Sequence, residues 1–208
     1  LTDAKNESVY PEKFLTYDFD FSDLDDISNF VKSLVSQYGK FTGLVHSAGI
    51  GGVVPLKSVN IDEAKKMFDI NYFSGLALAK SFADKRLCQA PASLVFISSI
   101  SSISGNAGIS NYSASKGAVD SMVKSLAVEL AKNNIRVNSV LPGFILTDIV
   151  NTSPDVYNDA FFEKIAQEYP LGTGLPEDVA HLIAFLLSPL SRWITGQNIV
   201  IDGGRTLL

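Results

Sequence analysis

Short apolar segments alternate with longer segments of helical periodicity along this chain, and this alternation restricts the possible folds most strongly. Strands are predicted at residues 14–19, 43–47, 93–99, 135–143 and 198–204. Helices are predicted at residues 25–38, 62–85, 111–132 and 176–188. Strands that are apolar on both faces and alternate with helices are typical of a parallel sheet covered by helices. We therefore predict an α/β fold with a doubly wound parallel sheet in a single domain.

The segment 25–38 shows how clear the helical periodicity is. One apolar stripe is formed by side chains at i, i+3, i+4, i+7 and i+8 spacing, namely Ile27, Phe30, Val31, Leu34 and Val35. Gly39 follows the stripe, and glycine is the usual residue just past a helix end. The stripe predicts that this helix packs against the sheet.

Composition and charge narrow the choice of partners and compartment. With 208 residues and 46% hydrophobic content, the chain can bury the core of one domain. The net charge of -5, without a basic run, argues against nucleic acid or an anionic membrane as the main partner. The start lacks the apolar core of a signal peptide, and no apolar run approaches the ~20 residues that cross a bilayer. The single cysteine, Cys88, fits a reducing cytoplasm. From the charge, we expect small molecules as the partners.

Small residues follow three of the predicted strands, where ligands bind in open parallel sheets. Ser47 to Gly49, Ser98 with Ser99, and Pro142 to Thr147 each come directly after or at the end of a strand. The crevice beyond the carboxyl ends of the strands is the usual ligand site of such sheets. We therefore expect the functional site at this edge.

A tyrosine and a lysine four residues apart, Tyr112 and Lys116, begin the predicted helix that follows Ser99. At this spacing both side chains lie on one face of the helix. A cation about 4 Å from a phenol is worth roughly 4 kcal/mol at an effective dielectric of ~20, so Lys116 is expected to lower the pKa of Tyr112 from about 10. The spacing alone also fits two solvent-facing side chains.

Seven motifs in order give the chain a resemblance, over almost its whole length, to the short-chain dehydrogenase/reductase family. They are FDFSD containing Asp20, HSAG ending at Gly49, DIN ending at Asn71, ISS ending at Ser99, YSASK starting at Tyr112, LPGFILTD ending at Asp148, and ITGQNIVIDGG. The resemblance implies a Rossmann-like sheet and an NAD- or NADP-dependent oxidoreductase. Such an enzyme interconverts a carbonyl and a secondary alcohol by hydride transfer. The motifs look most like the 3-oxoacyl-carrier-protein reductase branch.

The resemblance also implies catalytic roles for four residues. Tyr112 would be the general acid for carbonyl reduction or the base for alcohol oxidation, and Ser99 would stabilise the substrate oxygen. Lys116 would lower the pKa of Tyr112 and bind the nicotinamide ribose. Asn71 would position a water that relays protons, although it also fits a plain backbone contact in a bent helix.

Further residues are implied in cofactor binding, in addition to Tyr112 and Lys116. Asp20 and Phe21 would contact adenine, the adenosine ribose would lie against Ser47, Ala48 and Gly49, and the nicotinamide end would lie against Pro142, Gly143, Ile145 and Thr147. Asp20 equally fits a loop or cap residue. Ser47 stands where the family commonly has asparagine. His46 is expected to be a packed strand residue and Cys88 a helix residue without chemistry, and no metal site is predicted.

The glycine-rich turn that holds the cofactor pyrophosphate in this family is not found before Asp20. The predicted strands match the family's third to seventh, and its first two lie between the third and fourth. With strands ~4.8 Å apart, the strands that match the third and fourth would stand about 14 Å from each other if the first two were missing. We therefore expect that the chain lacks its first βαβ unit and that a further segment precedes Leu1. The choice between NAD and NADP depends on residues of that unit.

Two other classes of function stay open, and the substrate is not specified. A lyase or dehalogenase on the same scaffold is disfavoured by Lys116, and a non-catalytic regulatory protein by the complete set of Ser99, Tyr112, Lys116 and Asn71. Apolar side chains are expected to line the substrate pocket: Phe144, Val150, Tyr157, Phe161 and Phe162. The resemblance implies a homotetramer or homodimer built by the helices over 62–85 and 111–132.

Overall fold

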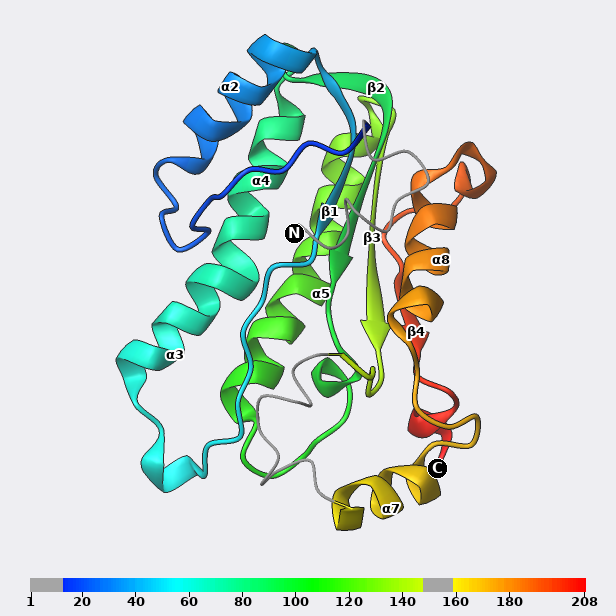
Figure 1. Ribbon diagram of the computed structural model, residues 1–208. Helices are drawn as coiled ribbons and strands as arrows, with labels where there is room; N and C mark the ends of the chain where they lie inside the picture. The colour runs from blue at the N-terminus through cyan, green and yellow to red at the C-terminus, as the bar shows by residue number, and fades with distance from the viewer. Residues whose placement is uncertain (1–12, 148–158) are drawn as a thin grey trace.

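Four parallel strands form the sheet in the computed structural model, which describes residues 13–147 and 159–208 (Figure 1). The strands are β1 (Phe41–His46), β2 (Cys88–Ile97), β3 (Ile135–Pro142) and β4 (Asn198–Ile201), and they lie in that order across the sheet. Each neighbouring pair is parallel. The carboxyl ends of the strands therefore meet at one edge, as the alternation predicts.

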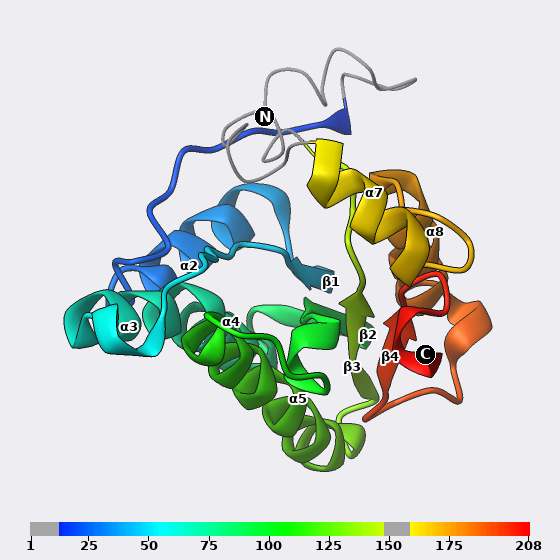
Figure 2. The ribbon, with the colours of Figure 1, turned by 90° about the horizontal axis from the view of Figure 1, so that it is seen from below.

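Helices cover both faces of this sheet, which confirms the doubly wound α/β prediction. The helices are α2 (Ile27–Tyr38), α3 (Ile61–Phe68), α4 (Ser74–Ala83), α5 (Ser110–Ala131), α7 (Asp159–Glu168) and α8 (Pro176–Leu187). Short 3-10 turns cover Leu56–Ser58, Ile100–Ser102, Pro189–Ser191 and Arg205–Leu207. Figure 2 shows α4 and α5 on one side of the strands and α8 on the other. Helix α2 lies beside α4 and packs against it.

The core divides between the two faces because successive strand side chains point in opposite directions. Leu94 and Phe96 of β2 pack with Val123 of α5, whereas Val95 between them packs with Leu186 of α8. All five side chains are buried. The continuous apolar character of β2 is therefore explained by helices on both sides of the strand.

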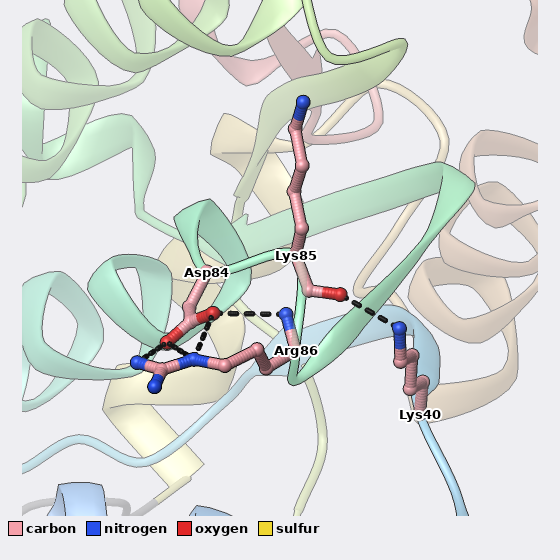
Figure 3. Close-up of polar contacts among 4 residues, drawn as sticks. All are labelled: Lys40, Asp84, Lys85 and Arg86. Atoms are coloured by element: carbon pink, nitrogen blue, oxygen red, sulfur yellow. Dashed lines mark hydrogen bonds and ion pairs between the residues drawn. The ribbon is translucent and has the colours of Figure 1, made fainter.

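The connection between α4 and β2 is fixed by polar contacts at the amino end of the sheet (Figure 3). The Asp84 carboxylate accepts hydrogen bonds from the backbone N–H of Arg86 at 2.8 Å and from its guanidinium at 2.6 Å. Lys40, just before β1, donates to the Lys85 carbonyl at 2.8 Å. These contacts align the starts of β1 and β2, away from the edge where the site is expected.

The predicted strand at residues 14–19 is wrong, because this segment forms no ladder in the structure. A strand needs a partner, and within the described residues β1 pairs only with β2, so its other edge has no neighbouring strand. Phe19 instead stacks on Phe30 of α2 with ring centroids 4.3 Å apart. The side chains of Phe14 and Leu15 are exposed.

Other boundaries also differ from the predictions, since β2 begins at Cys88 instead of residue 93 and β4 ends at Ile201 instead of residue 204. The helix predicted at residues 62–85 consists of α3, one turn of π-helix (Asp69–Phe73) and α4. Helix α7 lies in a segment without a predicted element. Periodicity does not reveal a single inserted residue in a helix, and this insertion is what produces the π-helical turn. Asp148, Val150 and Tyr157 lie outside the described residues.

An apolar groove of about 350 Å³ runs along the unpaired edge of β1, and we call it the β1 groove. Its lining comes from Phe21, from Phe30, Val31 and Leu34 of α2, from Leu78 and Phe82 of α4, and from β1 itself with Ser47 and Ala48. The groove lies between α2 and β1, on the side where the two family strands are expected. The presence of a preceding βαβ unit stays a prediction.

Candidate active site

The four residues implied in catalysis meet at the carboxyl edge of the sheet, and we call them the proton-transfer centre. Tyr112 and Lys116 lie in the first two turns of α5, and Ser99 lies just past β2. Asn71 comes from the π-helical turn between α3 and α4. The centre is linked to the end of β1 by the loop at Gly49 and Ile50.

Lys116 is buried, and its side chain reaches the carboxyl edge of the sheet. Its ammonium group donates a 2.8 Å hydrogen bond to the Ile97 carbonyl at the end of β2 and lies 5.8 Å from the centroid of the Tyr112 ring. Burial lowers the pKa of Lys116 to about 8, and the charge of Asp120 one turn further along α5 opposes this shift. Lys116 thus sits beside the phenol as expected and titrates near neutral pH.

Tyr112 is half-buried, and its phenol differs from the expectation in one respect. Burial raises the pKa of Tyr112 above its ordinary value, and hydrogen bonding with the Ser99 hydroxyl opposes the rise. In this arrangement the predicted lowering of this pKa by Lys116 is not found, because the ammonium group is directed to the Ile97 carbonyl. Tyr112 is therefore protonated at neutral pH, as a proton donor must be.

Ser99 is held in a fixed orientation at the start of the 3-10 turn after β2. Its backbone is extended, with φ -165° and ψ 152°, and its Oγ accepts a 3.1 Å hydrogen bond from the N–H of Ser101. Accepting this bond leaves the single hydroxyl hydrogen free to donate, and the same hydroxyl hydrogen bonds with Tyr112. Ser99 is therefore arranged to donate to an oxygen placed beside Tyr112.

Asn71 is buried, and its side-chain amide joins the end of β1 to α5. The Oδ1 atom accepts from the N–H of Ile50 at 2.8 Å, and Nδ2 donates to the Ile50 carbonyl and to Ser115 Oγ, each at 2.9 Å. The contact with Ile50 is the backbone contact that the simpler interpretation predicts. Both amide hydrogens are used in these bonds, so only Oδ1 retains a free lone pair.

Gly49 lies close to the proton-transfer centre. A Cβ atom at this position would be 3.3 Å from Asn71 Oδ1 and 3.4 Å from Lys116 Nζ. Ser47 and Ala48 precede it at the end of β1 and line the β1 groove. The three residues implied in adenosine ribose binding therefore connect the groove with the centre.

The loop that contains Pro142, Gly143, Ile145 and Thr147 is held by a segment that the sequence did not indicate as functional. The Phe144 N–H donates to the Tyr169 phenol at 3.0 Å, and Leu146 donates to the Gly174 carbonyl at 2.9 Å. Gly143 has no room for a side chain, since a Cβ atom would be 2.8 Å from the Tyr169 ring and 2.9 Å from Asp202 Cα. Tyr169 and Gly174 thus position this loop at the ends of β3 and β4.

Sequence reasoning missed Tyr169 because the signal is weak. It lies 25 residues from its partner Phe144, after a helix that was not predicted, and no motif contains it. A tyrosine directly before a proline, at a site where the chain turns back to the sheet, is the only indication in the sequence.

Asp20 and Phe21 lie apart from the proton-transfer centre. The Asp20 carboxylate accepts from the N–H of Ser22 at 2.9 Å and from its hydroxyl at 2.8 Å, which lowers the pKa of Asp20. This contact is that of a loop residue capping its own turn. Phe21 lines the β1 groove and meets the His46 ring edge-on at 6.5 Å between centroids. Phe21 therefore belongs to the groove side of the site, whereas Asp20 contacts only its own turn in the bonds described above.

His46 and Cys88 are buried, in agreement with a packing role, although Cys88 begins β2 and is not in a helix. The His46 Nε2 atom is 2.7 Å from Ser74 Oγ, and burial lowers the pKa of His46 to about 4. Among the described residues, no group of three or more His, Cys, Asp or Glu side chains could hold a metal ion.

Comparisons with known proteins identify the same family as the motifs. The family model described as enoyl-(acyl carrier protein) reductase matches residues 3–206. The 3-oxoacyl-[acyl-carrier-protein] reductase FabG of Rickettsia conorii is 39% identical over 178 residues, which cover 85% of this chain and 72% of the relative.

Solved structures extend the likeness to the fold. A 4-hydroxyisoleucine dehydrogenase mutant complexed with NADH and succinate is 32% identical, with a TM-score of 0.88 over 100% of this chain and 84% of the other. ElxO with NADP bound is 29% identical, with a TM-score of 0.87 over 97% of this chain and 82% of the other. The chain belongs to the short-chain dehydrogenase/reductase family.

Proposed function

We infer that this chain is an NAD- or NADP-dependent oxidoreductase that interconverts a ketone and a secondary alcohol by hydride transfer. One observation carries this inference most directly. Ser99, Tyr112 and Lys116 converge at the carboxyl edge of a parallel sheet, with the phenol half-buried and the ammonium beside it. Ketone reduction by a bound nicotinamide requires this pairing of an oxygen-binding hydroxyl with a proton donor.

The described residues fit the nicotinamide end of such a cofactor. The Lys116 ammonium can donate to ribose hydroxyls, and the absence of a side chain at Gly49 leaves the backbone open beside it. The loop held by Tyr169 and Gly174 approaches the same edge. Within residues 13–147 and 159–208, a glycine-rich turn at a helix N-terminus, which would hold the pyrophosphate, is not found.

The protein's own groups account for the proton and for the orientation of the substrate. When bound, the reduced nicotinamide supplies a hydride to the carbonyl carbon. Ser99 donates a hydrogen bond to the carbonyl oxygen, and the Tyr112 hydroxyl transfers its proton to that oxygen. The raised pKa of Tyr112 keeps this proton in place until the oxygen becomes basic. Stabilisation of the remaining phenolate by Lys116 would require its ammonium group to turn from the Ile97 carbonyl toward the phenol oxygen.

Asn71 supports this chemistry through position. Its amide fixes Ile50 and Ser115, so that the loop after β1 and the first turns of α5 keep their distance. A relay water would have to use the remaining lone pair of Oδ1 or a backbone carbonyl, because both amide hydrogens are occupied. This relay remains part of the proposal.

A 3-oxoacyl thioester is the substrate that we propose first. The FabG relative is a 3-oxoacyl-[acyl-carrier-protein] reductase by name. Phe144 packs against Phe161 and Phe162 of α7, with centroids 5.2 and 6.4 Å apart, so that aromatic rings stand beside the loop near the site. These rings suit an acyl chain better than a charged group. The lyase and regulatory alternatives are not favoured by the comparisons.

The proposal includes a homotetramer or homodimer in a reducing cytoplasm. The α5 residue Val128 is 82% exposed, and an exposed aliphatic side chain on this helix is compatible with packing against a second copy. Cys88 is buried, and burial raises the pKa of its thiol, so it suits a reduced compartment. Size-exclusion chromatography coupled to light scattering would measure the number of subunits in the oligomer.

The test is a reductase assay on a 3-oxoacyl thioester and a panel of ketones, with NADH and NADPH in separate series. Oxidation of the reduced cofactor should be seen by absorbance with at least one ketone. Cofactor binding is measured first by the fluorescence of the reduced nicotinamide. A protein that binds the cofactor and turns over no ketone or secondary alcohol would support the regulatory alternative instead.

A further inference from the structure

Helix α5 buries two charged side chains on consecutive turns. Lys116 is 5% exposed and Asp120 is 7% exposed. In the described part of the chain, no other Lys, Arg, Asp or Glu is buried. Residues at i and i+4 are neighbours on a helix surface, so the two side chains share one buried face of α5. This pairing brings a carboxylate to the back of the proton-transfer centre.

The Asp120 carboxylate is poorly satisfied by hydrogen bonds. Its Oδ1 atom lies 3.3 Å from the Ser139 hydroxyl, but that hydroxyl is closer to Asn198 Oδ1, at 2.8 Å, and has a single hydrogen to share. No group among the described residues hydrogen bonds to Oδ2. A buried carboxylate with so few partners is unfavourable unless an opposite charge lies within reach.

Lys116, one turn earlier on the same buried face of α5, is the cation placed to supply this compensation. Among the described residues, the ammonium also interacts with the Ile97 carbonyl that accepts its hydrogen bond, the Tyr112 ring on its own helix, and His46 on β1. None of these carries a net charge at neutral pH, because the pKa of Tyr112 is raised and that of His46 is lowered. Asp120 is the group whose charge opposes the lowering of the Lys116 pKa by burial.

We propose that Asp120 is a positioning residue for the proton-transfer centre, whose buried carboxylate keeps the Lys116 ammonium charged at the pH where the enzyme works. Without this carboxylate, burial would favour the neutral amine. A neutral amine could not stabilise a Tyr112 phenolate by its charge. It would also bind ribose hydroxyls less strongly than the ammonium group. The consequence for the cofactor rests on the proposed oxidoreductase function, whereas the charge of Lys116 does not.

A purely structural role for Asp120 makes different predictions. Its backbone carbonyl accepts from Asn198 Nδ2 at 3.3 Å, and Ser139 touches its side chain, so Asp120 also ties α5 to β3 and β4. If that tie were its whole function, removal of the Ser139 hydroxyl would act in the same direction as removal of the carboxylate. Both changes would then lower stability and leave the titration of Lys116 unchanged.

The direct test is an NMR titration of the Lys116 side chain in ¹³C-labelled protein, without cofactor, with the signal assigned by its loss in Lys116→Met. The midpoint, about 8 in the wild type, should fall by about one pH unit in Asp120→Ala. Asp120→Glu should restore most of the difference, and Ser139→Ala should leave the midpoint within about 0.3 units. Alanine leaves no polar group unpaired, and Asp120→Asn serves if Asp120→Ala does not fold.

Equal midpoints in the wild type and in the folded Asp120 variant would overturn the proposal, and so would an equal shift in Ser139→Ala. A second measurement follows the dissociation constant of the reduced cofactor against pH. It should be nearly unchanged by Asp120→Ala at pH 6 and raised about fivefold at pH 8, where the two midpoints give different fractions of charged lysine. A protein that binds no cofactor would contradict the proposed function and leave the titration result standing.

Discussion

The two sides of the sheet edge differ in how completely these residues build them. The proton-transfer centre is enclosed by directional contacts, with Lys116 bonded to Ile97 and Asn71 bonded to Ile50 and Ser115. The β1 groove is lined mainly by apolar side chains along a strand edge that no described strand pairs with. Ser47 and Ala48 belong to the groove, and Gly49 next to them touches the centre.

This difference separates two requirements of catalysis. Proton transfer needs a few polar atoms at fixed positions, and those are supplied by α5, by the end of β2 and by the π-helical turn. Cofactor affinity needs a larger surface, of which, in our proposal, the described residues provide the nicotinamide side and the floor of the groove. Substitutions on the two sides should therefore change different kinetic constants.

The largest effect is expected from Tyr112→Phe, which removes the proton donor and leaves the β1 groove intact. The turnover number for ketone reduction should fall by about 10³-fold, within the range for loss of a general acid. The dissociation constant of the reduced cofactor should stay within about twofold, because the phenol oxygen makes a small part of the contact. A turnover number within tenfold of the wild type would exclude Tyr112 as the proton donor.

His46 stands between the two sides and should make stability depend on pH. The ring is neutral in the folded protein, where its pKa is about 4, and has the ordinary value of about 6.5 when unfolded. The unfolded state therefore binds the proton more strongly, so stability is fully present above pH 6.5 and falls as the pH drops to about 4. The loss should reach about 3 kcal/mol.

Urea unfolding between pH 4 and pH 7 measures this effect, with His46→Gln as the matched variant. Glutamine keeps a group that can bond to Ser74 but does not titrate, so this share of the pH dependence should vanish. The same slope in both proteins would show that other groups cause it.

Gly49→Ala tests the boundary between the groove and the centre. The new Cβ atom would stand 3.3 Å from Asn71 Oδ1, which is tighter than an ordinary contact, and 3.4 Å from Lys116 Nζ. We expect the dissociation constant of the reduced cofactor to rise by about tenfold, or about 1.4 kcal/mol, through displacement of the Asn71 amide and the added methyl group beside Lys116. Gly52→Ala is the control, because a Cβ atom there meets nothing within 4 Å. Equal dissociation constants for the reduced cofactor in Gly49→Ala and Gly52→Ala would show that Gly49 does not lie at the boundary between the β1 groove and the proton-transfer centre.

The sequence was sufficient to predict those parts of the site that depend on local structure. Tyr112, Lys116 and Ser99 lie within 18 residues on one strand-loop-helix unit, so their relative position follows from the element order. The inward direction of Asn71 depends on the π-helical turn, which hydrophobic periodicity does not indicate. The failure at residues 14–19 has the opposite cause, because a strand is defined by pairing with another strand and this segment pairs with none of the described strands, although one edge of β1 is unpaired.

Tyr169→Phe should have the smallest effect, and it tests whether the loop after β3 belongs to the cofactor side or to the centre. The change removes the oxygen that accepts from the Phe144 N–H at 3.0 Å while the ring still packs against Gly143. Loss of one buried hydrogen bond costs about 1 kcal/mol, so the Michaelis constant for the cofactor should rise about fivefold with little change in turnover number. Steady-state kinetics at saturating ketone separate the two constants. A fall in turnover number at an unchanged Michaelis constant would instead place this loop with Tyr112, because it would mean that Tyr169 supports a contact made only during proton or hydride transfer.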